Sequence, residues 1–141
     1  MQADPPPLPS VVSHFHYGGQ VSAAAGPGGR FALRLRAEGD APFEVTGVQS
    51  NYPGLSVSVA GGLPVAVGPG RPVELTVAFA VTDCAQAPPD AGLPFLDVTL
   101  RNTRAIETVS QILGPDYARD LSENLHSACP NSAQRTPTSA G

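Results

Sequence analysis

The chain has 141 residues, 41% of them apolar, and a formal net charge of −4. This length and composition suit one domain with a substantial core. All eight basic residues are arginine, so the chain lacks the lysine-rich patch that would attract nucleic acid or anionic lipid. No apolar run approaches the roughly 20 residues of a membrane span, and the N-terminus lacks the pattern of a signal peptide. We therefore expect a soluble domain without a nucleic-acid partner.

The two ends of the chain differ in composition from its middle. Residues 1–10, MQADPPPLPS, contain too many prolines for a helix or a central strand, which predicts an extended tether. Because this tether starts abruptly, we expect an export signal or membrane anchor upstream of it, and membrane contact only through such an anchor. Residues 131–141 are small, polar and unpatterned, which predicts a disordered tail. The folded part is expected at 11–130.

Alternation of apolar and polar residues with a period of two predicts strands along most of the folded part. In residues 30–36, Phe31, Leu33 and Leu35 share one face and arginines share the other. In residues 43–50, Gly47 shifts the alternation as at a β-bulge, so that Val48 rejoins the apolar face. Further strands are predicted in five more alternating runs, at 55–59, 63–67, 73–81, 95–102 and 105–113.

Only the last segment changes to a helical period. Tyr117, Leu121 and Leu125 recur every four residues, and Pro115 suits the first position of a helix. The spacing predicts one helix of about three turns after Gly114. About seven short strands followed by this helix predict a mainly β fold, an immunoglobulin-like antiparallel β-sandwich with the helix on one end or edge.

The two cysteines carry the strongest chemical signal. Cys129 lies four positions after Leu125 on the apolar stripe of the predicted helix, and Cys84 follows the longest strand, so both are expected where the helix meets the sandwich. We predict a disulfide, worth about 4 kcal/mol for a loop of 45 positions. We expect this link to decide whether the short helix stays docked. The alternative is that His126 and Cys129 form a reactive or metal-binding pair.

Three histidines are candidate metal ligands. His14 and His16 share one face of a predicted strand and His126 lies on the helix, so three imidazoles could bind zinc or copper if the helix packs over the edge of that strand. We favour the alternative that His14 and His16 are exposed polar residues, because the set lacks a carboxylate ligand. A second possible ligand set, for calcium, is Asp83, Asp90 and Asp97. Its spacing does not match a calcium loop, and we expect Asp83 to hold a turn.

Two further features are candidate contact surfaces. One strand face carries the arginines Arg30, Arg34 and Arg36. They could bind an anionic partner, but we favour a solvated face whose charges are matched across the ladder, for instance by Glu74. The turn with Tyr52 and Pro53 and the loop with Pro88 and Pro89 could contact a protein partner, although each is more simply a turn.

The sequence contains no pattern that indicates catalysis. It has no serine nucleophile elbow and no phosphate-binding glycine loop, because Gly26, Gly28 and Gly29 precede a strand instead of opening a helix. We therefore expect neither enzymatic activity nor a cofactor.

Two stretches, VTDCAQAPPDAGLPFLDVTLRNTRAI and ILGPDYARDLSENLHSACP, carry a resemblance to other proteins. They resemble the C-terminal half of uncharacterised actinobacterial proteins, exported or membrane-anchored, that often carry a Tat-signal label. The similarity runs from about SHFHY to the second cysteine, and it implies a cell-envelope location without an assigned activity. We therefore expect a non-catalytic envelope module that binds another envelope protein or assists assembly. The alternative is a metal-handling envelope protein that uses His14, His16 and His126.

Overall fold

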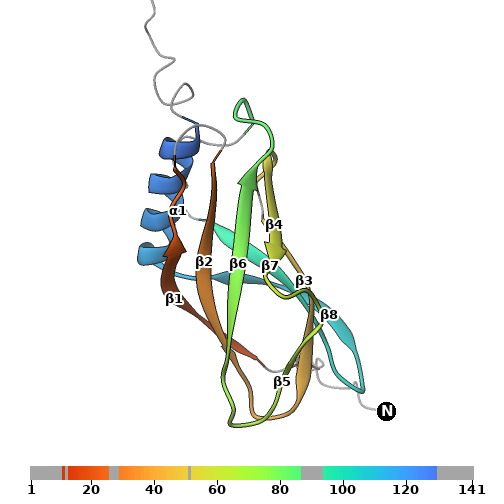
Figure 1. Cartoon of the computed structure of the whole chain (residues 1–141). Coiled ribbons are helices and arrows are strands. Elements are labelled where there is room, and N and C mark those ends of the chain that lie inside the picture. Colours follow the sequence, from red (N-terminus) through yellow and green to blue (C-terminus); the bar gives the residue numbers. More distant parts are fainter. Residues whose placement is uncertain (1–10, 12, 26–28, 51, 87–93, 130–141) are drawn as a thin grey trace, which may run out of the picture.

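Two antiparallel β-sheets and one C-terminal helix make up the described part of the computed structural model of the chain (Figure 1). The structure describes residues 11, 13–25, 29–50, 52–86 and 94–129. The predicted tether at 1–10 and the predicted tail at 131–141 lie outside these residues. The mainly β sandwich with one C-terminal helix is confirmed, and each sheet has four strands.

The strand order follows that of immunoglobulin domains. Sheet A has the order β1 (His14–Ser22), β2 (Arg30–Glu38), β6 (Val73–Val81) and β4 (Leu55–Val59). Sheet B has the order β5 (Val65–Val67), β3 (Phe43–Ser50), β7 (Phe95–Arg101) and β8 (Ile106–Ile112). These orders match the ABED and CFG sheets of an immunoglobulin constant domain, with β5 as a short extra strand beside β3.

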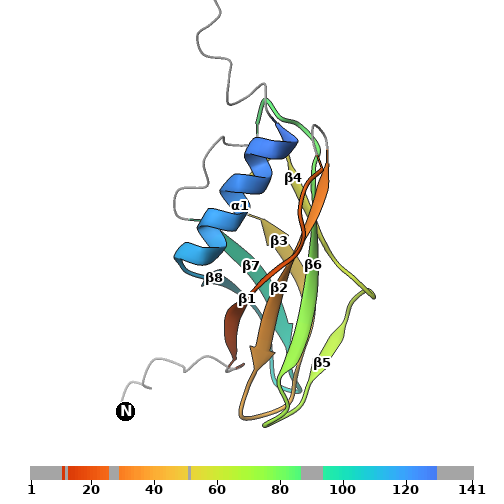
Figure 2. The same ribbon diagram turned by 60° about the vertical axis from the view of Figure 1, so that its left-hand side comes forward.

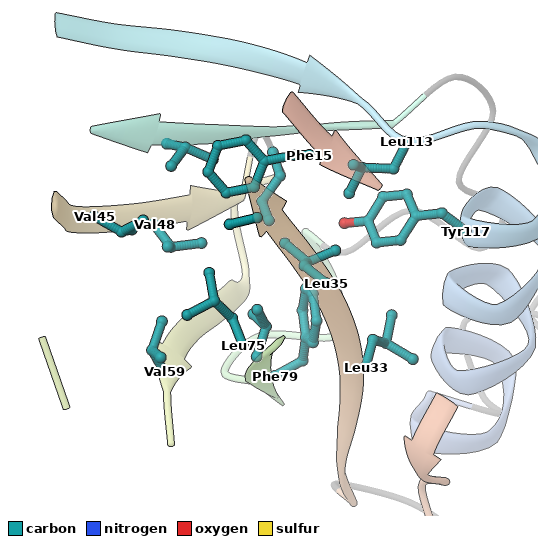
Figure 3. Packing of buried hydrophobic residues seen from close by; sticks show 14 of the residues in the cluster. Phe15, Leu33, Leu35, Val45, Val48, Val59, Leu75, Phe79, Leu113 and Tyr117 are labelled. Atoms are coloured by element: carbon teal, nitrogen blue, oxygen red, sulfur yellow. The ribbon is translucent and has the colours of Figure 1, made fainter. Parts of the chain in front are cut away.

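The predicted alternation places one face of each main strand in the core. On the neighbouring strands β2 and β6 the alternate apolar residues are buried, and the rings of Phe31 and Phe79 stack with centroids 5.0 Å apart. On β3 the register shifts between Val45 and Gly47, which is the predicted bulge, and Val48 is buried. Figure 3 shows side chains from the two sheets meeting in the space between them.

Helix α1 (Pro115–Ala128) closes one side of the sandwich. It has 14 residues, which is about four turns instead of the three predicted. It lies beside β1, across the open side between the two sheets (Figures 1 and 2). Tyr117, Leu121 and Leu125 are each only 1% exposed and belong to the same hydrophobic cluster as the strands. Figure 3 shows Tyr117 pointing from α1 toward Leu35.

Hydrogen bonds fix α1 against β1 and the residues that follow it. The Tyr17 hydroxyl donates to Asp120 Oδ2 at 2.6 Å. Asn124 is only 3% exposed; its Oδ1 accepts from the Ala24 N–H at 2.8 Å, and its Nδ2 donates to Gln20 Oε1 at 2.6 Å. A polar side chain is tolerated in such a buried place because its hydrogen bonds are made. We call this set of residues, Tyr17, Gln20, Ala24, Asp120 and Asn124, the β1–α1 seam.

Truncation of Leu121 tests whether α1 is part of the core. We expect Leu121→Ala to lower the free energy of unfolding by about 2–5 kcal/mol, because it leaves a cavity between helix and sheets. Urea titration followed by circular dichroism measures this. The exposed Glu123 on the opposite face of α1 provides the control, since Glu123→Ala is expected to change stability by no more than about 0.5 kcal/mol. Equal effects of the two substitutions would contradict the burial of this helix face.

Candidate functional site

Among the described residues, three of the four edge strands carry protection against pairing with another chain, and β8 does not. β1 has register shifts on either side of Gly19 and is covered by α1. β4 has five residues and β5 has three. β8 has seven residues and pairs with β7 without a register shift. Bulges, short strands and a covering helix are the usual means by which proteins block sheet edges.

The side chains of β8 do not protect it either. Its sequence, IETVSQI, has no proline and no basic residue, and Glu107 is its one charged residue. Ile106 is 68% exposed and Ile112 is 62% exposed, which makes them the most exposed large apolar residues of the described chain. Thr108 and Ser110 lie between them on the same exposed face. We call β8 with these four exposed side chains the β8 edge.

Local sequence at both ends positions β8. The Asn102 side-chain oxygen accepts hydrogen bonds from the backbone N–H of Arg104 at 2.8 Å and of Ala105 at 2.9 Å, which closes the β7–β8 hairpin. At the other end Gly114 has a φ of +95°, a conformation that glycine adopts readily, and Pro115 follows it at the start of α1. The chain therefore leaves β8 sharply and turns back along the open side of the sandwich.

Two side-chain hydrogen bonds join β8 to β7 on the outer face of sheet B. The Ser110 hydroxyl donates to Asp97 Oδ1 at 2.6 Å, and the hydroxyls of Thr99 and Thr108 lie 3.0 Å apart. The polar middle of β8 is thus bonded within the molecule, whereas the two isoleucines at its ends face solvent.

Two hollows lie near the ends of sheet B. One, of about 410 Å³, lies where β8 meets α1, and its walls include Phe15, Tyr17, Ile112 and Pro115. The other, of about 390 Å³, is mostly apolar and is lined by β3, β5 and the end of β7, where Arg101 forms an ion pair with Glu44. The apolar walls of the second hollow, with a few polar groups among them, suit contact with side chains of a partner.

The structure does not bring the three candidate metal ligands together. His14 and His16 are exposed on β1, as predicted, and His16 Nε2 lies 2.9 Å from Oε2 of Glu38 on β2. Tyr17, next to His16, contacts Asp120, whereas His126 lies about 9 Å further along the helix axis. Within the described ranges no three His, Cys, Asp or Glu side chains are grouped as a metal site.

The aspartates of the candidate calcium set have separate places. Asp83 Oδ1 accepts a hydrogen bond from the Ala85 N–H at 3.0 Å, so Asp83 holds the turn after β6 as predicted. Asp97 lies on β7 and accepts from Ser110. Asp90 lies outside the described residues.

The arginine face has the matched charges that the sequence favours. Strands β2 and β6 are neighbours, Arg36 lies opposite Glu74 in the ladder, and the side chain of Arg34 reaches Glu74 at 3.5 Å. Arg30, the third arginine of the row, is exposed at the start of β2. This face is therefore a partly neutralised, solvated surface.

Of the two candidate contact loops, the one with Tyr52 and Pro53 is a turn, which is the interpretation that the sequence favours. Tyr52 is half-buried and packs against the hydrophobic core, and Pro53 follows it in a turn. Hydrogen bonds from the N–H groups of Thr82 and Asp83 to the carbonyl of Gly54 tie this turn to the end of β6. Tyr52 thus serves the fold. Candidate residues Pro88 and Pro89 lie outside the described residues.

A disulfide joins Cys84 to Cys129, the predicted pair, with Cα atoms 5.6 Å apart. Neither sulfur is a free thiol, so the alternative pair of His126 with a Cys129 thiolate is not formed. The bond ties the loop after β6 to the end of α1. The helix is also held by its buried stripe and by the β1–α1 seam, so the disulfide is one of three attachments in the described part of the chain. We therefore expect it to have a smaller share in docking the helix than the sequence suggests.

Two tyrosines between α1 and the sandwich are held in their neutral form. Burial raises the pKa of the Tyr17 hydroxyl above its usual value, and the hydrogen bond to the carboxylate of Asp120 raises it further. Burial also raises the pKa of the Tyr117 hydroxyl. Their rings meet edge to face with centroids 5.5 Å apart.

Sequence reasoning missed both the β1–α1 seam and the β8 edge. Asn124 gave a signal for the seam, because it lies on the same helical face as Leu121 and a polar residue on an apolar stripe indicates a buried hydrogen bond. For β8, Ile106 and Ile112 alternate in step with Thr108 and Ser110. That alternation places the two isoleucines on the polar face of the strand.

Removal of the disulfide tests how much of the attachment of α1 depends on it. For Cys84→Ala with Cys129→Ala we expect a loss of about 2–4 kcal/mol in the free energy of unfolding, because the unfolded chain is no longer closed into a loop. We also expect the helical circular dichroism signal to persist at 25 °C. Loss of this signal with the sheets intact would instead show that the covalent link alone docks the helix. Alkylation of wild-type cysteines without prior reduction would contradict the disulfide itself.

High pH tests the buried tyrosines. Unfolded tyrosines lose their protons near pH 10, whereas folded Tyr17 and Tyr117 keep theirs to higher pH, so the stability they confer is full below about pH 10 and is lost as pH rises. The chain has no lysine to obscure this range. We expect Tyr17→Phe to show a smaller fall in the free energy of unfolding between pH 8 and pH 11, measured by urea titration. Equal slopes for the variant and the wild type would contradict the raised pKa.

Comparison with known proteins does not assign a family. No protein-family model matches the chain, and no curated protein matches it. No helix in the described part of the chain is both long enough and apolar enough to span a membrane. The resemblance to exported actinobacterial proteins stays a prediction.

Proposed function

We propose that this protein is a non-catalytic, extracytoplasmic module of the cell envelope that binds a protein partner or assists assembly through the β8 edge. The observation that carries the proposal is a seven-residue edge strand without bulge, proline or basic residue, whose first and last residues are isoleucines that are more than 60% exposed. Addition of a strand to an exposed sheet edge is a recurring mode of protein recognition. Apolar side chains at the ends of such an edge add contact area to the backbone hydrogen bonds.

The disulfide supports an extracytoplasmic location. Disulfides persist in oxidising compartments and are rare in reducing cytosol. The Cys84–Cys129 bond is therefore compatible with an envelope or secreted protein. The resemblance to exported actinobacterial proteins favours the same compartment, and the natural class of partner is another protein of the envelope.

The architecture favours binding over metal handling. Immunoglobulin-like sandwiches commonly present loops and edges on a rigid scaffold. The metal alternative requires His14, His16 and His126 to converge, and they lie at different levels along β1 and α1.

Photo-crosslinking in intact cells tests the proposal. A benzophenone amino acid in place of Ile106 is expected to form a covalent adduct with an envelope protein, because this side chain stands at the edge where the partner strand would lie. The matched control is the same group in place of Leu63, an exposed apolar residue away from β8.

Two further outcomes bear on the same proposal. An additional Ile112→Glu substitution is expected to abolish the adduct at position 106 by placing a charge on the apolar edge. Irradiation that gives no adduct at position 106, or equal adducts at 106 and 63, would contradict a binding role for β8.

A further inference from the structure

We propose that the strand bound at the β8 edge belongs to a second copy of this chain, so that two β8 strands pair antiparallel across a two-fold axis at Val109. The inference rests on the proposed function of this edge and names its partner. The sequence IETVSQI is chemically symmetric about Val109. Isoleucine stands three positions away on both sides, a hydroxyl residue stands one position away on both sides, and Glu107 is matched by Gln111.

This symmetry matters because a two-fold axis pairs each residue with the one equally far on the other side of the axis. In the proposed dimer Ile106 lies opposite Ile112 of the second copy, and Thr108 lies opposite Ser110 of the second copy. Each apolar side chain therefore meets an apolar one, and each hydroxyl meets a hydroxyl. Such cross-strand pairs are the units that stabilise antiparallel sheets.

The exposed side chains select one register. A two-fold axis at Thr108, or one at Ser110, would leave one isoleucine of each copy beyond the end of the paired strands. A shift of the pairing by one residue would place the exposed side chains of one strand on the same side as the core-facing side chains of the other, so the isoleucines of the two copies would no longer meet. The axis at Val109 pairs all seven residues of β8 and covers both isoleucines.

Charge does not oppose this pairing. Each β8 carries one acidic residue, Glu107, whose carboxylate accepts a hydrogen bond from the Val11 N–H of its own chain at 3.2 Å. In the proposed dimer the residue opposite Glu107 is the neutral Gln111 of the second copy. The two glutamates lie about 13 Å apart along the paired strands, which exceeds the screening length of about 8 Å in physiological salt. Since each copy has a net charge of −4, we expect added salt to strengthen association.

The pairing extends sheet B across both molecules. Its strand order becomes β5, β3, β7, β8 in one copy, followed by β8, β7, β3, β5 in the other. The hydrogen bonds of Thr108 and Ser110 to β7 hold the polar middle of the edge in place for pairing. A contact of one seven-residue strand is small, so we expect a weak dimer that depends on concentration.

Sedimentation velocity of the full chain, from about 1 µM to about 1 mM, tests the proposal. We expect a monomer–dimer equilibrium for the wild type. Ile106→Glu and Ile112→Lys should each raise the dissociation constant at least about tenfold, because each removes both Ile–Ile pairs of the symmetric dimer. Both side chains are exposed, so folding should be unchanged. The matched control is Val21→Glu, an exposed valine on β1 whose replacement should leave dimerisation unchanged.

Mixing the two variants tests the register. A dimer of one Ile106→Glu chain with one Ile112→Lys chain places glutamate opposite lysine in one pair and keeps isoleucine opposite isoleucine in the other. The mixture should therefore associate more tightly than either variant alone. Absence of this recovery, or dimerisation that the two single variants do not weaken, would overturn the proposal.

A wild type that stays monomeric throughout this range would also overturn the second copy as partner. Hydrogen exchange then tests for an occupant from the same chain, since slow exchange in the monomer of those β8 amides that do not bond to β7 indicates a segment of the same chain. The crosslinking experiment separates this failure from that of the proposed function. Adducts at position 106 with a different envelope protein retain the binding role of β8 while excluding self-pairing.

Discussion

The docking of α1 across one side of the sandwich is the interaction on which the rest of the structure depends. Two stacked sheets leave apolar side chains open to water along their sides, and on this side Tyr117, Leu121 and Leu125 fill that opening. The helix could not be stable in isolation at this length, so it exists because the sheets offer it an apolar surface. In return the core gains the large side chain of Tyr117, which points from α1 into the space between the sheets (Figure 3).

Polar contacts give this docking a single register. An apolar stripe alone would permit α1 to slide along the sandwich, whereas the hydrogen bonds of Asn124 to Ala24 and Gln20 are made at one position only. Tyr17 adds a bond to Asp120 nearer the start of the helix. The disulfide at Cys129 then ties the far end, so the helix is fixed along its whole length.

The position of α1 also decides which sheet edge is open. The helix covers β1, so the edge of sheet A on this side is blocked, while β8 on the same side of sheet B keeps its outward face. The broad faces of the sheets carry matched polar groups, such as Arg34 with Glu74 and Ser110 with Asp97. In the part of the chain that the structure describes, one edge therefore combines a backbone that can pair outward with two exposed isoleucines, and this is the edge that we propose for contact with another protein strand.

The sequence by itself determined the elements and the core. Alternation of period two located the long strands and the bulge at Gly47, and the four-residue spacing of Tyr117, Leu121 and Leu125 located the helix, because burial of one face imposes these periods locally. The pairing of Cys84 with Cys129 followed from the same stripe. The length of α1, the partners of Asn124 and the separation of His16 from His126 depend on how β1 and α1 lie side by side, which no local period encodes.

Whether β8 is an edge was likewise decided only by the tertiary structure. The pattern of IETVSQI is that of any half-buried strand, and the exposure of Ile106 and Ile112 depends on which strand lies beside it. That neighbour is set by the order of all eight strands and by the place of the helix, which are contacts between residues far apart in the chain. The sequence specified which residues could pair, and the fold decided which strand was left to pair outward.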